Sequence, residues 1–414
     1  MFGPQFSSLF KNRNFLRIWV SQVASQITIS MVNFALIARI FEATGSSVAV
    51  SFLWITYGLP ALLIGPFVGP LIDLVSKRKI LIMTNLLQAV SIFSYHLVKN
   101  KLFPLYTIVF VYSFLDQFYL PAEAVSIPAL VPKKKLGEAN SLYSLTFQAS
   151  FMAGFALAGP VIALLGPDSP FFMGAALLLL ASLSVYGLPQ REPDHRPRSF
   201  VAYWQDLTEG YQYVRDHPLI YLPILFITSF QTGFSIIAAV FPSYVSNLLH
   251  LAVRDASWVL VLPGALGALL AASYLLPRLQ NKVRKIRVIE IGLGLAAVAL
   301  LVMGIITSVL PLAGARLVAS FSAVLAGMAG LFLIVPSNTL IQEQTPPALR
   351  GRVFGSLTFL LTIAMVAPTL MAATVADIIG PGVMAVLMGL AAVSVLVLSR
   401  TKGEQILKSA LPLT

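Results

Sequence analysis

The sequence predicts an all-α membrane protein with twelve transmembrane helices in two pseudo-symmetric six-helix halves. Of 414 residues, 57% are hydrophobic and only 11% charged, with a mean hydropathy of +0.85, whereas a soluble protein carries about 25% charged residues. The apolar residues form continuous runs, which indicate spanning helices of ~20 residues rather than the alternating strands of a membrane barrel. The longest polar stretch divides these runs near the midpoint of the chain.

The apolar runs define the twelve predicted spans. In the first half they cover residues 15–40, 47–72, 80–98, 102–124, 139–165 and 171–188. In the second half they cover residues 219–249, 256–276, 288–310, 312–340, 353–376 and 380–398. The bases before the first run are not followed by a short apolar stretch with a small-residue cleavage site, so we expect the first span to be retained.

The polar stretch in the middle predicts the domain organisation. We expect an N-terminal half at residues 1–188, a cytoplasmic linker at 189–217 and a C-terminal half at 218–414. Within the linker, residues 199–215 predict a surface helix, because apolar side chains recur there at spacings of three and four. These side chains are Tyr203, Trp204, Leu207, Tyr211 and Val214.

The basic residues predict the orientation. Most of the 28 lysines and arginines fall in alternate polar segments, starting with the N-terminus and ending with the C-terminal tail. By the positive-inside rule, both termini of this multi-pass protein are then cytoplasmic and the location is the cell (inner) membrane. The net charge of +12 is explained by topology, so no nucleic-acid partner is expected.

The two halves share an internal repeat. A shift of 215 residues aligns Pro-containing turns, bases and small-residue-rich spans at equivalent places. The aligned pairs are Pro121 with Pro336, Pro132 with Pro347, Lys135 with Arg350, Ser141 with Ser356, and Leu142 with Leu357. We interpret this as duplication of a six-helix unit.

A charged turn after the second span carries a motif. The segment 65–79 ends an apolar run in Asp73, followed by Lys77, Arg78 and Lys79. Together with two six-helix halves and a basic central linker, this turn resembles the major facilitator superfamily over about residues 15–399. The family's signature loop is G-x-x-x-D-R-x-G-R-R/K. It is matched here by Gly69, Asp73, Lys77 and Arg78, with Leu74 replacing a base and Ser76 a glycine.

The resemblance implies that this loop is a conformational latch that joins the two halves in the outward-facing state. A carboxylate near a helix end can pair with bases or with another helix N-terminus. The alternative is that its bases only set the topology.

Three further segments are similar to the macrolide-efflux and drug-exporter branch, which also contains siderophore exporters. They are I-W-V-S-Q-V-A-S-Q-I-T, A-T-G-S-S and P-A-E-A-V-S-I-P-A-L-V-P. In the fifth span, Gly154, Gly159 and Pro160 partly resemble the family's antiporter motif, although Ala163 and Leu164 replace later glycines. Small residues also serve ordinary close helix packing.

Intramembrane charges are the main functional candidates. Asp116 lies well inside the fourth span, which lines the central cavity in the resembling fold; it could exchange protons, contact a cationic substrate or make a structural pair. Glu123 is a second candidate nearer the cytoplasmic end, where structural contacts are the alternative. The arginine that drug antiporters of this fold often carry in the fourth span has no counterpart here.

Polar side chains in other spans are candidates for the substrate cavity. Gln22, Gln26 and Asn33 lie in the first span, with interhelical hydrogen bonding as the alternative. Arg316, near the outer end of the tenth span, could contact an anion. After that span, we expect Glu343 to pair with Arg350 or Arg352.

The sequence lacks the residues that metal sites, ATP-driven pumps and enzymes would need. The chain has no cysteine, its four histidines are dispersed, and it has no G-x-x-x-x-G-K-[ST] loop. We expect no metal, no cofactor, no ATP coupling and no enzymatic activity.

The resemblance to the major facilitator superfamily therefore implies a secondary active transporter that works by alternating access, and we expect it to be a monomer. The favoured function is proton-coupled export of small amphipathic, drug- or macrolide-like compounds, with the substrate, protons and the lipid bilayer as partners. The alternatives are a siderophore exporter, a lysolipid flippase or a nutrient importer of the same fold, and outside transport a ligand-binding receptor or scaffold.

Overall fold

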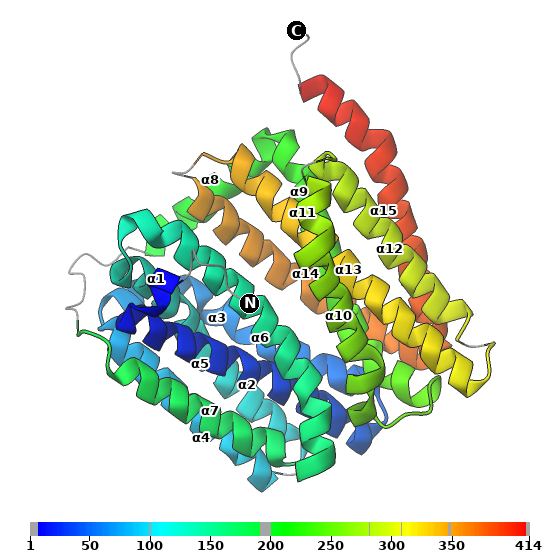
Figure 1. The fold of residues 1–414 in the computed structure, drawn as a ribbon, viewed down its shortest axis with the longest axis horizontal. Helices are drawn as coiled ribbons and strands as arrows, with labels where there is room; N and C mark the ends of the chain where they lie inside the picture. Colours follow the sequence, from blue (N-terminus) through cyan, green and yellow to red (C-terminus); the bar gives the residue numbers. More distant parts are fainter. Residues whose placement is uncertain are drawn as a thin grey trace. The chain divides into compact units, whose positions relative to one another are not determined.

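The computed structural model describes residues 7–98, 101–190, 200–280, 282–307, 309–346 and 349–410. Within these ranges the chain is helical, with no strand (Figure 1). The first helices are α1 (Ser7–Phe10), α2 (Arg13–Thr44), α3 (Ser47–Asp73), α4 (Lys77–Val98), α5 (Leu102–Leu130), η2 (Lys133–Lys135), α6 (Leu136–Leu165) and α7 (Ser169–Tyr186). Most begin and end within a few residues of the predicted spans.

The later helices are again separated by short connections. They are α8 (Phe200–Asp216), α9 (Pro218–Asn247), η3 (Val253–Asp255), η4 (Ser257–Val261), α10 (Leu262–Leu270), η5 (Ala271–Leu275), α11 (Leu276–Gln280), α12 (Lys285–Ile305), α13 (Leu312–Gln344), α14 (Arg350–Ile379) and α15 (Pro381–Ala410). The surface helix expected at 199–215 is confirmed as α8. The rest of the predicted linker includes residues 191–199, which lie outside the described ranges.

Four spans differ from the sequence expectation. The twelfth was expected to end at residue 398, whereas α15 continues to Ala410. The predicted fourth span ends at residue 124, but α5 continues to Leu130 through Pro121 and Pro128, because neighbouring groups in a membrane protein can satisfy the carbonyls that a proline frees. The ninth was expected to reach residue 310, whereas α12 ends at Ile305 before Pro311. The eighth contains two π-helical turns, η4 and η5, on either side of α10.

Ten helical stretches of the described residues are long and apolar enough to cross a membrane. They include neither α5, which carries Asp116 and Glu123, nor α14 at full length. The all-helical membrane class is confirmed, and the exact number of twelve spans stays a prediction.

The chain divides into two compact units. The first comprises Met1–Ala43 and Ile55–Tyr203, and the second comprises Thr44–Trp54 and Trp204–Thr414. The start of α3 therefore belongs to the second unit, while the rest of α3 belongs to the first. The linker boundaries at residues 189 and 217 stay predictions.

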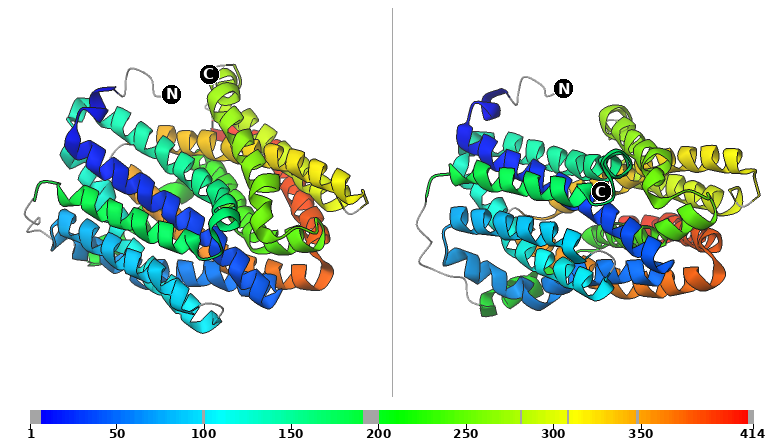
Figure 2. Two further views of the ribbon diagram at one scale, coloured as in Figure 1. Left: turned by 60° about the horizontal axis from the view of Figure 1, so that its bottom comes forward. Right: turned by 90° about the horizontal axis from the view of Figure 1, so that it is seen from below.

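In the first unit α2 is the central helix, with α6 and α7 packed closely against it. A Cβ atom on Gly154 of α6 would lie 2.6 Å from the Ile27 carbonyl oxygen, and one on Gly174 of α7 would lie 2.9 Å from Thr28. Figure 2 shows α7 running along α2. Helices without a Cβ at such positions approach closely enough for dense packing in lipid.

In the second unit α12 packs between α13 and α15 (Figure 1). The backbones of α10 and α13 almost touch, since a Cβ on Gly267 would lie 2.0 Å from the Val324 carbonyl oxygen. The corresponding helices α6 and α14 each end at a glycine with positive φ, Gly166 at 94° and Gly380 at 91°, followed by proline. The two glycines lie 214 residues apart, one less than the shift of 215 in the predicted repeat.

Candidate functional site

Asp116 lies midway along α5 and joins three helices of the first unit. Its Oδ2 accepts a hydrogen bond from the Tyr57 hydroxyl of α3 at 2.9 Å, and its Oδ1 accepts one from Gln88 Nε2 of α4 at 3.4 Å. Ser113, one turn earlier on α5, donates to the Tyr57 carbonyl oxygen at 2.5 Å. Both partners of the carboxyl are neutral, so they orient it without neutralising a negative charge.

Beside Asp116 is a small cavity with polar groups in its wall. It measures about 10 Å³, roughly the room of one water molecule. Side chains of α2 to α5 line it: Ile29, Val32, Asn33, Leu36, Tyr57, Tyr95, Val109 and Tyr112. Tyr57 belongs both to this wall and to the Asp116 cluster, although Asp116 itself does not line the cavity. Asn33, a predicted cavity residue, is 9% exposed and faces this space.

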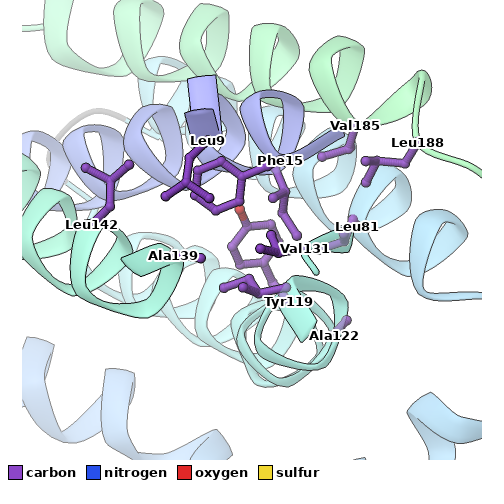
Figure 3. Packing of buried hydrophobic residues seen from close by; sticks show 12 residues of the cluster. Leu9, Phe15, Leu81, Tyr119, Ala122, Val131, Ala139, Leu142, Val185 and Leu188 are labelled. Atoms are coloured by element: carbon purple, nitrogen blue, oxygen red, sulfur yellow. The ribbon is translucent and has the colours of Figure 1, made fainter. Parts of the chain in front are cut away.

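Glu123, two turns further along α5, is buried in a second polar cluster. Its Oε1 accepts a hydrogen bond from Tyr119 at 2.7 Å, and its Oε2 accepts one from Tyr143 of α6. The Tyr119 hydroxyl is 3.0 Å from Ser21 Oγ of α2. Figure 3 shows the Tyr119 ring inside an apolar cluster with Phe15, so its ring is packed and its hydroxyl paired.

The chain of hydrogen bonds continues from Ser21 to α4. Asn85 Nδ2 donates to Ser21 Oγ at 3.2 Å, and Ser25 Oγ donates to Asn85 Oδ1 at 3.1 Å. Because Ser21 Oγ accepts a hydrogen bond from Asn85, its own proton is available to the Tyr119 hydroxyl. The Tyr119 hydroxyl in turn donates its proton to Glu123. The chain is thus polarised toward the carboxyl group.

The remaining predicted residues of the first span have helix neighbours as partners. Thr146 of α6 donates to Gln22 Oε1 at 3.1 Å, while Gln22 Nε2 is buried without a partner in the described structure. Gln26 Nε2 is 3.5 Å from Ser30 Oγ. Gln22 and Gln26 are therefore apart from the wall that contains Asn33.

Sequence reasoning missed a charged cluster at the end of α2. Asp168, in the turn between α6 and α7, pairs with Arg39 of α2 and lies 2.9 Å from His96 Nδ1 of α4. The Arg39 guanidinium also stacks over Phe171 at 4.5 Å. Partial burial alone would raise the pKa of Asp168, but the hydrogen bonds and charges of Arg39 and His96 outweigh it and lower that pKa from 3.8.

The structure describes only part of the predicted latch. Gly69 and Asp73 lie in α3, but their side chains are outside the described part of the structure. Lys77 Nζ donates to the Ile72 carbonyl oxygen at 2.6 Å, which caps the end of α3. The Arg78 guanidinium lies 5.0 Å from the Tyr186 ring centre. The latching role stays a prediction.

In the antiporter-like segment of α6, the first glycine, Gly154, allows close packing against α2. Gly154 contacts the backbone of α2 as described above, and Gly159 is buried in α6 next to Pro160. Packing is thus an established role for Gly154, and any motif function stays a prediction.

In the second unit Arg316 caps a helix end. Its Nε and one terminal nitrogen each donate at 3.1 Å, to the carbonyl oxygens of Leu249 and His250 just after α9. The expected pairing of Glu343 with Arg350 or Arg352 is wrong. Glu343 pairs with Lys285 of α12.

Arg352 instead contacts α8, where it pairs with Asp206 at 2.7 Å and with Glu209. These partners are distant in sequence and become neighbours only when α8 docks on α14. The described residues contain no group of three or more His, Cys, Asp or Glu that could hold a metal ion.

The comparisons with known proteins agree with this architecture. The chain matches the family model of the Major Facilitator Superfamily over residues 18–369. The chain therefore belongs to the Major Facilitator Superfamily, a family of membrane transporters rather than enzymes, and is a multi-pass membrane protein.

Individual relatives are more distant. An uncharacterized MFS-type transporter of Bacillus subtilis, YfiS, is 25% identical over 86% of both chains. Macrolide efflux protein A of Streptococcus pyogenes is 24% identical over 88% of this chain and 90% of that protein. The crystal structure of the nucleoside transporter NupG superposes with a TM-score of 0.69 at 14% identity, covering 92% of this chain and 97% of that one. The NupG likeness concerns the fold alone.

Proposed function

We propose that the chain is a proton-coupled exporter of small amphipathic compounds that works by alternating access, with Asp116 as the coupling or substrate-contacting group. The observation that carries this proposal is the setting of Asp116: it lies midway along a long apolar helix and accepts hydrogen bonds from two neutral donors, one of which, Tyr57, lines a small cavity. An unneutralised carboxylate is costly there. A proton or a cationic substrate group would therefore bind to it.

The likeness to macrolide efflux protein A supports export of a drug-like compound. The same helices also carry aromatic side chains, among them Phe114, Phe118 and Tyr57, which suit an amphipathic ligand. Asn33 and Tyr112 line the small cavity, which would have to widen before they could supply hydrogen bonds to such a ligand. Gln26 and Arg316 have protein partners, so binding by them would require these contacts to open. Gln22 has a partner for its oxygen only, since its Nε2 is without one among the described residues.

Glu123 is the second candidate for the coupling carboxyl. Both of its oxygens accept hydrogen bonds from tyrosines, and a polarised chain leads to it from α4. Within this chain only the Ser21 and Tyr119 hydroxyls can exchange protons with Glu123, because the Asn85 amide orients Ser21 and does not pass a proton on. Loss of coupling in Glu123→Gln with coupling retained in Asp116→Asn would move the assignment to Glu123.

The proposed orientation places both termini in the cytoplasm of a monomer in the inner membrane, with the turn of Gly69, Asp73, Lys77 and Arg78 as a cytoplasmic latch. The basic residues of the sequence support it. Because the chain has no cysteine, single cysteines near each terminus can report the orientation directly with a membrane-impermeant maleimide. Labelling from outside intact cells would contradict the orientation.

The decisive experiment is transport in proteoliposomes under an imposed pH gradient, with macrolides, cationic dyes and siderophores as test compounds. The proposal predicts gradient-driven movement of an amphipathic compound by the wild type and its loss in Asp116→Asn. Asp216→Asn is the control, since Asp216 is an exposed acid of α8. Movement that ignores the gradient would indicate a facilitator or flippase, and unchanged coupling in Asp116→Asn would reject Asp116.

A further inference from the structure

Asp377, near the end of α14, caps the beginning of α3. Its Oδ1 accepts a hydrogen bond from the Ser47 backbone N–H at 3.1 Å. Its Oδ2 accepts one from the Val48 N–H at 3.2 Å and another from the Ser46 hydroxyl at 2.9 Å. One carboxylate thus takes two main-chain amides and one hydroxyl from the first turn of α3.

The chemistry of this contact suits a carboxylate. The first amides of a helix have no partner within the helix, and the positive end of the helix dipole favours an anion. Ser46 is the local cap, since its Oγ accepts from Val48 at 3.2 Å and Ala49 at 3.4 Å. Ser47 Oγ is buried and has no hydrogen-bond partner among the described residues, whereas the backbone amides of Ser47 and Val48 are bonded by Asp377.

The contact lies on the part of α3 that belongs to the second unit. Residues 44–54 belong to the second unit, and α3 from Ile55 onward belongs to the first. Asp377 therefore binds the start of α3 within the second unit, and the same helix continues into the first unit. Its contact lies at the opposite end of α3 from Asp73 and the family's signature loop.

We propose that Asp377 is a gating residue that latches the start of α3 to the end of α14 in one conformation and releases it in the other. Asp73 lies at the end of α3, and Asp377 lies near the end of α14 but contacts the beginning of α3. The two acids would therefore act at opposite ends of α3. Closing one latch favours opening the other. The inference rests on the alternating-access mechanism proposed above, and it adds the residue that controls the second gate.

The absence of native cysteine allows a direct test. Ser47→Cys places a thiol at a position that is 0% exposed and whose hydroxyl has no hydrogen-bond partner in the described part of the chain, so the substitution is mild. The full chain, reconstituted in lipid without substrate or gradient, is treated with N-ethylmaleimide. Asp377→Asn in this background is expected to speed labelling by about tenfold, the effect of losing about one net hydrogen bond. Asp377→Glu is expected to restore much of the protection.

Two comparisons separate gating from simple loosening of the fold. Asp255→Asn, at another half-exposed acid of the second unit, is expected to leave the labelling rate unchanged. Asp73→Asn is expected to slow labelling, because loss of the opposite latch favours the state in which Asp377 is engaged. Equal rates in wild type and Asp377→Asn, or faster labelling in both Asp377→Asn and Asp73→Asn, would overturn the proposal.

Folding is monitored by size-exclusion chromatography. If Asp377→Asn does not give a monodisperse protein, Ser46→Ala is the second variant. It retains the carboxylate and its two amide bonds and is expected to show an intermediate rate, whereas an unchanged rate would overturn the latch. Since labelling needs no substrate, a negative result here leaves the transport proposal standing, and a failed transport assay leaves this result standing.

Discussion

The Tyr57 hydroxyl lies 2.9 Å from Oδ2 of Asp116, and this bond connects α3 to the middle of α5. α3 is also the helix whose start is held by Asp377. The protonation state of one carboxyl and the position of one helix are thus joined through a single phenol. A proton bound at Oδ2 would compete with the Tyr57 hydroxyl for that oxygen and weaken this bond, while the bond from Ser113 to the Tyr57 carbonyl oxygen would still join α5 to α3.

The first prediction concerns this bond. Tyr57→Phe keeps the ring but removes the donor, so we expect gradient-driven transport to fall by about tenfold while the protein remains folded. Tyr221→Phe, at a tyrosine that is 52% exposed, is the matched control and should transport normally. Transport by Tyr57→Phe at the wild-type rate, with the same response to the gradient, would show that the bond has no role in coupling.

The second prediction concerns the stability of the Glu123 cluster. Tyr119→Phe leaves one oxygen of a buried carboxyl without its donor, which is expected to cost about 1–3 kcal/mol of unfolding free energy. The double variant Tyr119→Phe, Glu123→Gln should lose less than the sum of the two single changes, because the residues interact directly. Thermal unfolding in detergent measures both, with Tyr211→Phe as an exposed control. Strict additivity would contradict the direct coupling.

The third prediction compares two glycines of α6. A Cβ at Gly154 would lie 2.6 Å from both the Ile27 carbonyl oxygen and Ser30 Cβ, whereas a Cβ at Gly137 meets nothing within 4 Å. Gly154→Ala should destabilise the fold by about 1–3 kcal/mol, the usual cost of overpacking. Gly137→Ala should be neutral or slightly stabilising, since alanine favours a helix. A normal melting temperature for Gly154→Ala would mean that α2 and α6 separate easily.

The helices were predictable from sequence because their signals are local. The start of α3 at Ser47, the extent of α8 and the glycine ends of α6 and α14 all follow from apolar runs, caps and turns. The paired acids were less predictable. Asp116 and Glu123 are conspicuous as charges in apolar runs, but their tyrosine partners look like ordinary apolar residues in the sequence. Tyr57 and Tyr143 lie on other helices, and only Tyr119 is a neighbour one turn away on α5.

Ion pairs between distant residues were the hardest to infer. Glu343 has Arg350 and Arg352 close by in sequence, yet it pairs with Lys285 because α12 packs along α13. Asp377 gives no sequence signal as a partner of α3, since the contact joins residues about 330 positions apart. Such pairs depend on helix packing, which a local pattern does not encode.

The last prediction concerns pH and the cluster of Arg39, His96 and Asp168. The pKa of Asp168 is lower in the folded protein than its ordinary value of 3.8, because the hydrogen bonds and charges of its partners outweigh partial burial. Its ionised form therefore stabilises the fold above pH 3.8, and this contribution is lost as the pH falls through the lowered folded value. Asp168→Asn should be less stable than wild type at neutral pH, with the difference shrinking below pH 3.8. Melting temperatures of both proteins over a pH series measure this, with Asp216→Asn, at a 58% exposed acid, as the control. Parallel curves for wild type and Asp168→Asn down to the most acidic pH would show that the carboxylate charge does not hold this end of α2.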